Sequence, residues 1–102
     1  MSKVVTVDIS NFVYQTDPVE IEVGDSVQWT NRDNMGHTAT REEVPAFDTG
    51  VLRRNTTSAP VLFTNVSDDD GFKYHCTPHP AMHGRIIVRE ARRISRELSP
   101  EG

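Results

Sequence analysis

Several residue types are scarce in this chain, and each shortage limits the structures it can form. Cys76 is the single cysteine, which excludes an intramolecular disulfide and suits a reducing or an oxidising compartment equally. No stretch approaches the roughly 18 consecutive apolar residues of a membrane-spanning helix, so we predict no membrane span. The 102 residues are nevertheless enough for one domain with a single hydrophobic core.

Basic residues are also scarce, with 11 Lys and Arg against 15 Asp and Glu and a formal charge of −4. Residues 1–88 carry 12 acidic and 7 basic side chains, a balance of −5, and residues 89–102 have a balance of +1. Phosphate binding needs a basic surface, so this composition argues against nucleic acid as the main partner. No signal peptide precedes the first apolar run, so the protein is cytoplasmic or its leader has been removed.

What the chain does contain is a series of short runs in which apolar and polar residues alternate. Turn-forming residues separate these runs, which cover residues 5–9, 19–23, 26–30, 60–66, 71–76 and 84–89. Several half-buried strands at this spacing predict an all-β fold, an antiparallel sandwich or barrel. Residues 41–59 are less regular, and we expect a long surface connection there.

The C-terminal stretch breaks the strand pattern. Ala91, Ile94 and Leu98 would share one face of a helix. A short amphipathic helix and a charged tail are both compatible with this pattern, because isolated helices of this length are marginal in water. We therefore predict one domain at residues 1–89 and a charged extension at residues 90–102.

The most informative residues lie on one short loop. Cys76, His79 and Met82 follow one another at intervals of three residues. Cys76 is the last residue of a predicted strand and takes one of its core-facing positions. Pro78 and Pro80 fix the backbone angles between them, so the three side chains can turn toward one point.

A fourth candidate, His37, stands 39 residues before Cys76, at the start of another extended stretch. Two imidazoles, one thiolate and a weak axial thioether are the ligand set of an electron-transfer copper site. Taken singly, Cys76 is more typical of a buried structural thiol and His37 of a turn or core residue. Their combination with His79 and Met82 favours a copper site and one-electron exchange.

With these residues the sequence resembles the cupredoxins, the small blue type 1 copper proteins. Within that family it is most similar to the amicyanins. The short loop Cys-Thr-Pro-His-Pro-Ala-Met at 76–82 carries the likeness, and segments 22–31 and 47–50 extend it. The resemblance covers roughly residues 3–89. It implies a Greek-key β-sandwich and a soluble, non-enzymatic carrier that passes single electrons between a redox protein donor and acceptor.

The resemblance also implies roles for individual residues. His37, Cys76 and His79 would be equatorial ligands of one copper per chain, with Met82 axial and the residue before His37, Gly36, a candidate weak contact. The edge of the His79 ring would emerge in an apolar electron-transfer patch formed with Met35, Pro78, Pro80 and Ala81. A periplasmic or extracytoplasmic location is implied, with the leader absent from this chain; a cytoplasmic location is the alternative.

One departure from the family pattern concerns Thr38, which stands where many members have an asparagine that ties the two ligand loops together. We expect its hydroxyl to replace only part of that connection.

Two further histidines leave an alternative open. His75 faces away from the predicted core, which favours a surface strand residue, but in copper oxidoreductases a histidine directly before the cysteine can hold a second copper. His83 is the remaining histidine that such a site could use. The rival functions are therefore a subunit of a copper oxidoreductase with a second copper at His75, and a copper carrier or storage protein.

Overall fold

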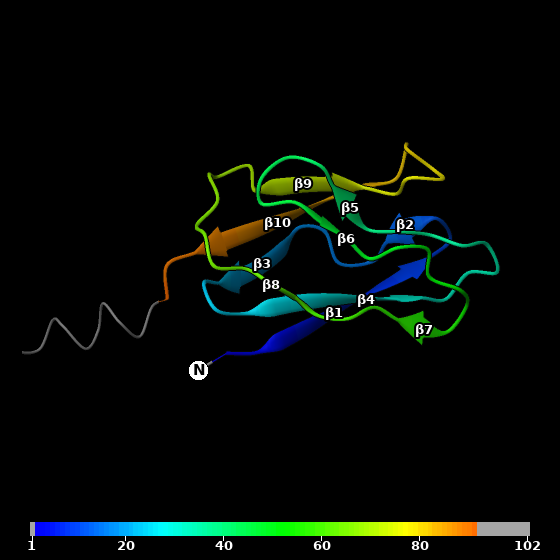
Figure 1. Cartoon of the computed structure of the whole chain (residues 1–102), viewed down its shortest axis with the longest axis horizontal. Coiled ribbons are helices and arrows are strands. Elements are labelled where there is room, and N and C mark those ends of the chain that lie inside the picture. Colours follow the sequence, from blue (N-terminus) through cyan, green and yellow to red (C-terminus); the bar gives the residue numbers. More distant parts are fainter. Residues whose placement is uncertain (1, 92–102) are drawn as a thin grey trace, which may run out of the picture.

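The computed structural model describes residues 2–91 and folds them into two facing β-sheets (Figure 1). The first sheet has the order β2-β1-β4-β7, with β8 also pairing with β4. Its strands are β1 (Val4–Ser10), β2 (Val13–Tyr14), β4 (Ser26–Asn31), β7 (Thr56–Thr57) and β8 (Val61–Leu62). The second sheet has the order β3-β10-β9-β5-β6. Its strands are β3 (Val19–Glu22), β5 (Thr40–Arg41), β6 (Phe47–Asp48), β9 (Phe72–His75) and β10 (His83–Arg89).

The predicted all-β sandwich is confirmed, but both sheets are mixed rather than purely antiparallel. β1 runs parallel to β4, and β3 runs parallel to β10. Alternation along a strand predicts which side chains are buried, but it carries no information on the direction of the neighbouring strand.

The core lies between the sheets and is built from the alternating apolar positions. Val7 and Ile9 of β1 and Trp29 of β4 are fully buried, facing Tyr74 of β9 and Ile86 of β10. The Trp29 and Tyr74 rings meet edge to face at 5.4 Å, and Trp29 Nε1 donates to the Tyr74 hydroxyl at 3.2 Å. This core fixes the ends of β4 and β9, from which the candidate ligands follow.

Two expectations about the middle of the chain need correction. The strand expected at 60–66 is only Val61–Leu62, although the Phe63 backbone still bonds to Gly24 and Asp25. Residues 41–59 are not simply a surface connection, because they contain β6, β7 and part of β5. These strands are two residues long, too short for alternation to predict them.

The helix or tail expected beyond residue 91 lies outside the described residues. Among residues 2–91, no helix is long and apolar enough to cross a membrane.

Candidate metal centre

Three of the four candidate ligands come together at one end of the sandwich. Cys76 Sγ lies 3.7 Å from His37 Nδ1 and 3.7 Å from His79 Nδ1. The three candidate ligand atoms all lie within 4.8 Å of one another. Cys76 and His37 are fully buried, and His79 is partly exposed.

This arrangement fits a bound metal ion. Metal bonds to thiolate sulfur and imidazole nitrogen are about 2.0–2.3 Å long, so one ion can reach both atoms of a pair 3.7 Å apart. Thiolate, imidazole and thioether together are soft ligands that suit copper. The donor set of His37, Cys76, His79 and Met82 therefore fits copper.

The backbone of the 76–82 loop closes on itself and brings Met82 back to Cys76. The His79 N–H donates to the Cys76 carbonyl at 3.2 Å, and the Met82 N–H donates to the His79 carbonyl at 2.9 Å. The Cys76 N–H in turn donates to the Met82 carbonyl at 3.2 Å. The Met82 side chain is buried, as an axial thioether beside the thiolate requires.

Gly84 allows the strand after this loop to approach β9 closely. A Cβ at Gly84 would lie 2.6 Å from atoms of the Tyr74 ring, closer than side-chain packing tolerates. Only glycine therefore fits where β10 passes the buried Tyr74.

His37 is held by a bridge to a distant segment. His37 and Leu52 exchange backbone hydrogen bonds of 3.3 and 2.8 Å. The buried Asn31 side chain, at the end of β4, donates 2.8 Å bonds to the carbonyls of both Met35 and Leu52. This amide joins the 32–36 loop to the segment that carries Leu52.

Asp33 determines which ring nitrogen of His37 faces Cys76. His37 Nε2 lies 2.9 Å from Asp33 Oδ2, and an Nε2–H donating there leaves Nδ1 free to bind the metal. The Asp33 carboxylate also accepts the N–H groups of Asn11 and Phe12, at 2.8 and 2.9 Å. Burial by itself raises the pKa of Asp33, but these hydrogen bonds and His37 hold that pKa below its usual value.

Thr38 links the two segments that carry the ligands. Its N–H lies 3.4 Å from Cys76 Sγ, and its hydroxyl accepts the Thr77 N–H at 2.9 Å. The same hydroxyl lies 2.8 Å from that of Thr40. Tyr14 donates to the Thr38 carbonyl at 2.6 Å, and burial raises the pKa of this tyrosine. The connection is thus made by hydroxyl groups and backbone N–H groups.

Phe12 contacts both imidazoles, a role that the sequence did not reveal. Its ring centroid lies 4.8 Å from that of His37 and 4.9 Å from that of His79, edge to face in each case. Phe12 has a φ of 60°, and Asn11 before it has a φ of 56°. An asparagine next to an alternating run predicts such a turn, but nothing in the sequence predicts where the ring lies.

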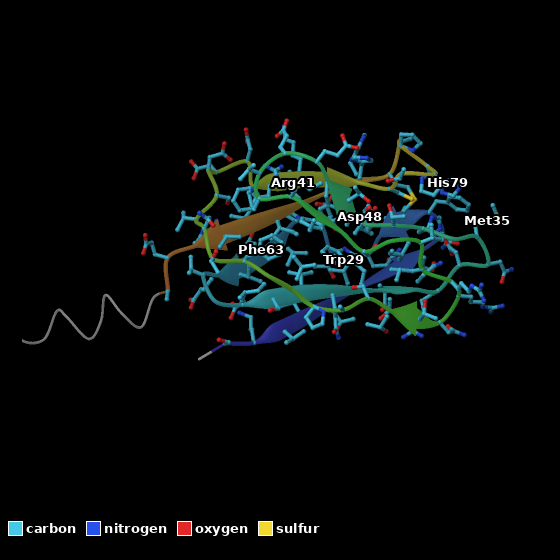
Figure 2. The ribbon with its side chains drawn as sticks, in the orientation of Figure 1. Trp29, Met35, Arg41, Asp48, Phe63 and His79 are labelled. Atoms are coloured by element: carbon cyan, nitrogen blue, oxygen red, sulfur yellow. The ribbon has the colours of Figure 1, made fainter. Side chains whose placement is uncertain are left out.

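The residues expected in the apolar patch are exposed around His79. Met35 is 52% exposed, and Pro78, Pro80 and Ala81 are also exposed. Figure 2 shows His79 and Met35 at the same end of the molecule.

His75 and His83 are not part of the convergent group. They lie directly opposite each other on β9 and β10. Among residues 2–91, the one set of three or more His, Cys, Asp or Glu residues close enough to share a metal ion is His37, Cys76 and His79.

Known proteins share both the sequence pattern and the fold. Residues 1–89 match the family described as copper binding proteins, plastocyanin/azurin family. The chain is 34% identical over 93 residues to the amicyanin of Paracoccus denitrificans, with 82% of this chain and 64% of the relative covered. It is 29% identical over 92 residues to a plastocyanin of Synechococcus sp. (strain JA-2-3B'a(2-13)), with 79% and 67% covered.

The solved structures agree with this relationship. A reduced single-site mutant of amicyanin matches with a TM-score of 0.75 at 29% identity, covering 83% of this chain and 81% of that one. The Cu(I) form of another amicyanin mutant matches equally well, with a TM-score of 0.75. The chain therefore belongs to the plastocyanin/azurin family of copper binding proteins, the cupredoxins, and copper is the metal of its His–Cys–His–Met site.

Proposed function

We propose that this protein carries single electrons between redox partners through one copper ion per chain. In this proposal His37, Cys76 and His79 are the equatorial ligands and Met82 is the axial ligand. The carbonyl of Gly36, one residue before His37, is a candidate weak contact. The observation that carries the proposal is the convergence of one thiolate sulfur and two imidazole Nδ1 atoms, with sulfur-to-nitrogen distances of 3.7 Å.

Copper, when bound, supplies one-electron exchange between Cu(I) and Cu(II). The protein's part is to hold the ligands still, because groups that keep their positions need no rearrangement when the charge changes. Asp33 holds His37, Thr38 holds the Cys76 sulfur, and the loop backbone holds Met82. The hydrogen bonds of Asp33 and Thr38 are partly buried and buried, and restrained ligands suit fast electron exchange.

Electrons would enter and leave at the metal-end patch, defined here as the exposed apolar residues around His79. Besides His79, the proposed patch comprises the predicted Met35, Pro78, Pro80 and Ala81. We add Phe12, which contacts the His79 ring, and Val51, which is exposed beside Gly36. His79 supports this assignment because it is the one partly exposed imidazole of the convergent group.

The partners in this proposal are a redox protein donor and acceptor. Small cupredoxins of this family are electron carriers rather than enzymes. We propose a periplasmic or extracytoplasmic location, on the basis of the similarity to amicyanins.

Spectroscopy of the Cu(II)-loaded protein tests the proposal. We expect one copper per chain, an intense visible absorption band from thiolate-to-copper charge transfer, and narrow copper hyperfine splitting in the electron paramagnetic resonance spectrum. Cys76→Ser should lose the band, while His75→Ala, one residue away, should keep both the band and the copper count.

Two other results would contradict the proposal. A pale sample with ordinary wide hyperfine splitting would favour copper storage. Two coppers per chain, falling to one in His75→Ala, would favour the oxidoreductase with a second copper.

A further inference from the structure

The end of the molecule that carries the metal-end patch differs in charge from the rest of the chain. Four segments form this end: 11–13, 32–36, 50–55 and 77–82. They contain three arginines, Arg32, Arg53 and Arg54, and a single carboxylate, Asp33. The chain as a whole has the opposite sign, with a net charge of −4.

Contacts place these arginines, which we call the arginine rim, beside the patch. Arg54 Nη1 donates to Asn34 Oδ1 at 2.8 Å, and Asn34 directly precedes the exposed Met35. Arg32 Nη1 donates to Asn55 Oδ1 at 3.3 Å. Arg53 follows Leu52, whose backbone is bonded to that of His37.

The rim keeps most of its positive charge unpaired. All three arginines are exposed. Arg32 lies 3.8 Å from the exposed Asp8, which offsets part of its charge. Within residues 2–91, neither Arg53 nor Arg54 forms an ion pair.

Asp33 is the one carboxylate within these four segments, and Asp48 lies at their edge, where it accepts the Gly50 N–H. The Asp33 side chain is only 14% exposed and is directed to Asn11, Phe12 and His37 through its hydrogen bonds. An approaching partner therefore meets guanidinium groups beside an apolar centre.

Most acidic groups lie outside these segments, although Glu42 and Glu43 line a surface pocket together with Pro80 of the patch. The exposed run Asp68-Asp69-Asp70 precedes β9, and Figure 1 shows this turn at the opposite end of the sandwich from the 76–82 loop. Glu20 lies on the edge strand β3 of the second sheet and pairs with Arg89, the last residue of β10. The exposed run Asp68-Asp69-Asp70 therefore lies away from the arginine rim (Figure 1).

We propose that the metal-end patch docks a redox protein whose contact surface presents carboxylates, which the arginine rim recognises. The proposal rests on the electron-carrier function proposed above and names the chemistry of the partner. Guanidinium groups match carboxylates in geometry as well as charge, and charges at the edge of an interface chiefly set the rate of association.

The net charge of the molecule and the local charge of the arginine rim predict opposite effects of salt on the rate of reaction with an anionic partner. If the net charge of −4 controlled association, an anionic partner would be repelled, and added salt would speed its reaction. If the rim controls it, the anion is attracted at the point of contact, and added salt slows the reaction.

Stopped-flow kinetics of the copper-loaded protein separates these effects. The inorganic probes are anionic hexacyanoferrate(III) and cationic tris(phenanthroline)cobalt(III), each of which takes one electron from the Cu(I) form. The protein probes are a reduced acidic plant-type ferredoxin, which gives one electron to the Cu(II) form, and an oxidised basic cytochrome c, which takes one from the Cu(I) form. We expect second-order rate constants that fall with rising ionic strength for hexacyanoferrate and ferredoxin, and no such fall for the two cationic probes.

A matched pair of double variants locates the effect. Arg53→Gln with Arg54→Gln should lower the low-salt rate for the anionic probes by roughly tenfold and flatten its salt dependence, since local fields change association rates by about 10- to 1,000-fold. Lys73→Gln with Arg89→Gln removes the same charge from exposed positions outside the rim. This control should change the rate by less than about twofold.

The outcomes also distinguish this proposal from the function on which it rests. Electron exchange with all four probes would support the electron-carrier function. If the rate constants for the anionic probes then rise with salt, or stay unchanged when Arg53 and Arg54 are replaced, the docking proposal alone is overturned. No exchange with any probe would overturn both.

Discussion

At the scale of single residues, Asp33 connects one of the ligands to a distant turn. Its carboxylate joins His37 to the turn that carries Phe12. We predict that Asp33→Ala lowers copper affinity by about 10- to 100-fold, the usual effect of removing a hydrogen-bond partner of a ligating histidine. Competition with a chelator of known affinity measures this loss.

The control for this prediction is Asp69→Ala, which removes an exposed carboxylate from the turn before β9. Equal affinities of the two variants would show that the Asp33 hydrogen bond does not position His37.

The candidate ligands could be predicted from the sequence, but the residues around them could not. Cys76, His79 and Met82 are predictable because three-residue spacing on a proline-containing loop is a local pattern. Asp33 and Phe12 act through contacts that depend on how the β1–β2 turn meets the 32–36 loop. No short-range pattern in the sequence contains that information.

At the scale of elements, Asp25 fastens the start of β1 to the turn between β3 and β4. It is 2% exposed and accepts the N–H groups of Glu22 and Lys3 at 2.9 Å each, and the Lys3 ammonium at 3.2 Å. Burial by itself raises the pKa of this carboxyl, but the hydrogen bonds and the Lys3 charge bring it below its usual value.

This shift has a defined effect on stability. A carboxyl whose folded-state pKa is lowered stabilises the protein above its unfolded pKa, near 4, and that contribution is lost as the pH falls through the folded pKa. We predict that Asp25→Asn lowers the free energy of unfolding by about 1–3 kcal/mol at pH 7, mainly through the buried hydrogen bonds. The difference from wild type should shrink toward pH 3.

Urea unfolding at pH 7 and pH 3 measures both effects, with Asp69→Asn as the exposed control. A difference that stays the same at the two pH values would mean that the charge of Asp25 contributes nothing.

The elements themselves were predictable to different degrees. Strands β1, β4, β9 and β10 follow the alternation of their own side chains and were predicted. The two-residue strands exist because a partner strand offers backbone groups, as when Thr30 and Asn31 of β4 pair with β7. Such pairings depend on tertiary packing rather than on local sequence, which is why they could not be predicted.

At the scale of the whole molecule, the metal site joins segments that are far apart in the sequence. His37 lies between β4 and β5, and Cys76 lies 39 residues later, between β9 and β10. A bound ion therefore crosslinks these two connections, and it can do so in the folded state only. We predict that the copper-free protein is folded, because most residues of its core cluster are not metal ligands. Copper should raise its stability by about 4 kcal/mol at a free concentration 1,000 times the Kd.

Calorimetry of the copper-free and copper-loaded protein should then show a Tm higher by more than about 10 °C with copper, since about 1 kcal/mol shifts a domain of this size by several degrees. Cys76→Ser should lose most of the difference. Similar Tm values for the two forms of the wild type would contradict a tightly held ion.

The fold of the described residues was predictable because the ligand loop is specific to one family. The position of the arginine rim was not, although the acidic excess is visible in the composition. Which end of the sandwich each charged side chain occupies depends on strand directions, including the parallel pairs that alternation does not reveal.

The places where the sandwich begins and ends have a practical consequence. The Lys3 carbonyl accepts the Ser26 N–H, and the Arg89 carbonyl accepts the Val23 N–H, so β1 starts and β10 finishes beside the same turn. Figure 1 shows that region at the far end of the molecule from the loop that holds His79. A linker fused before β1 or after β10 would therefore attach the protein to an electrode or a fusion partner with its redox centre facing outward.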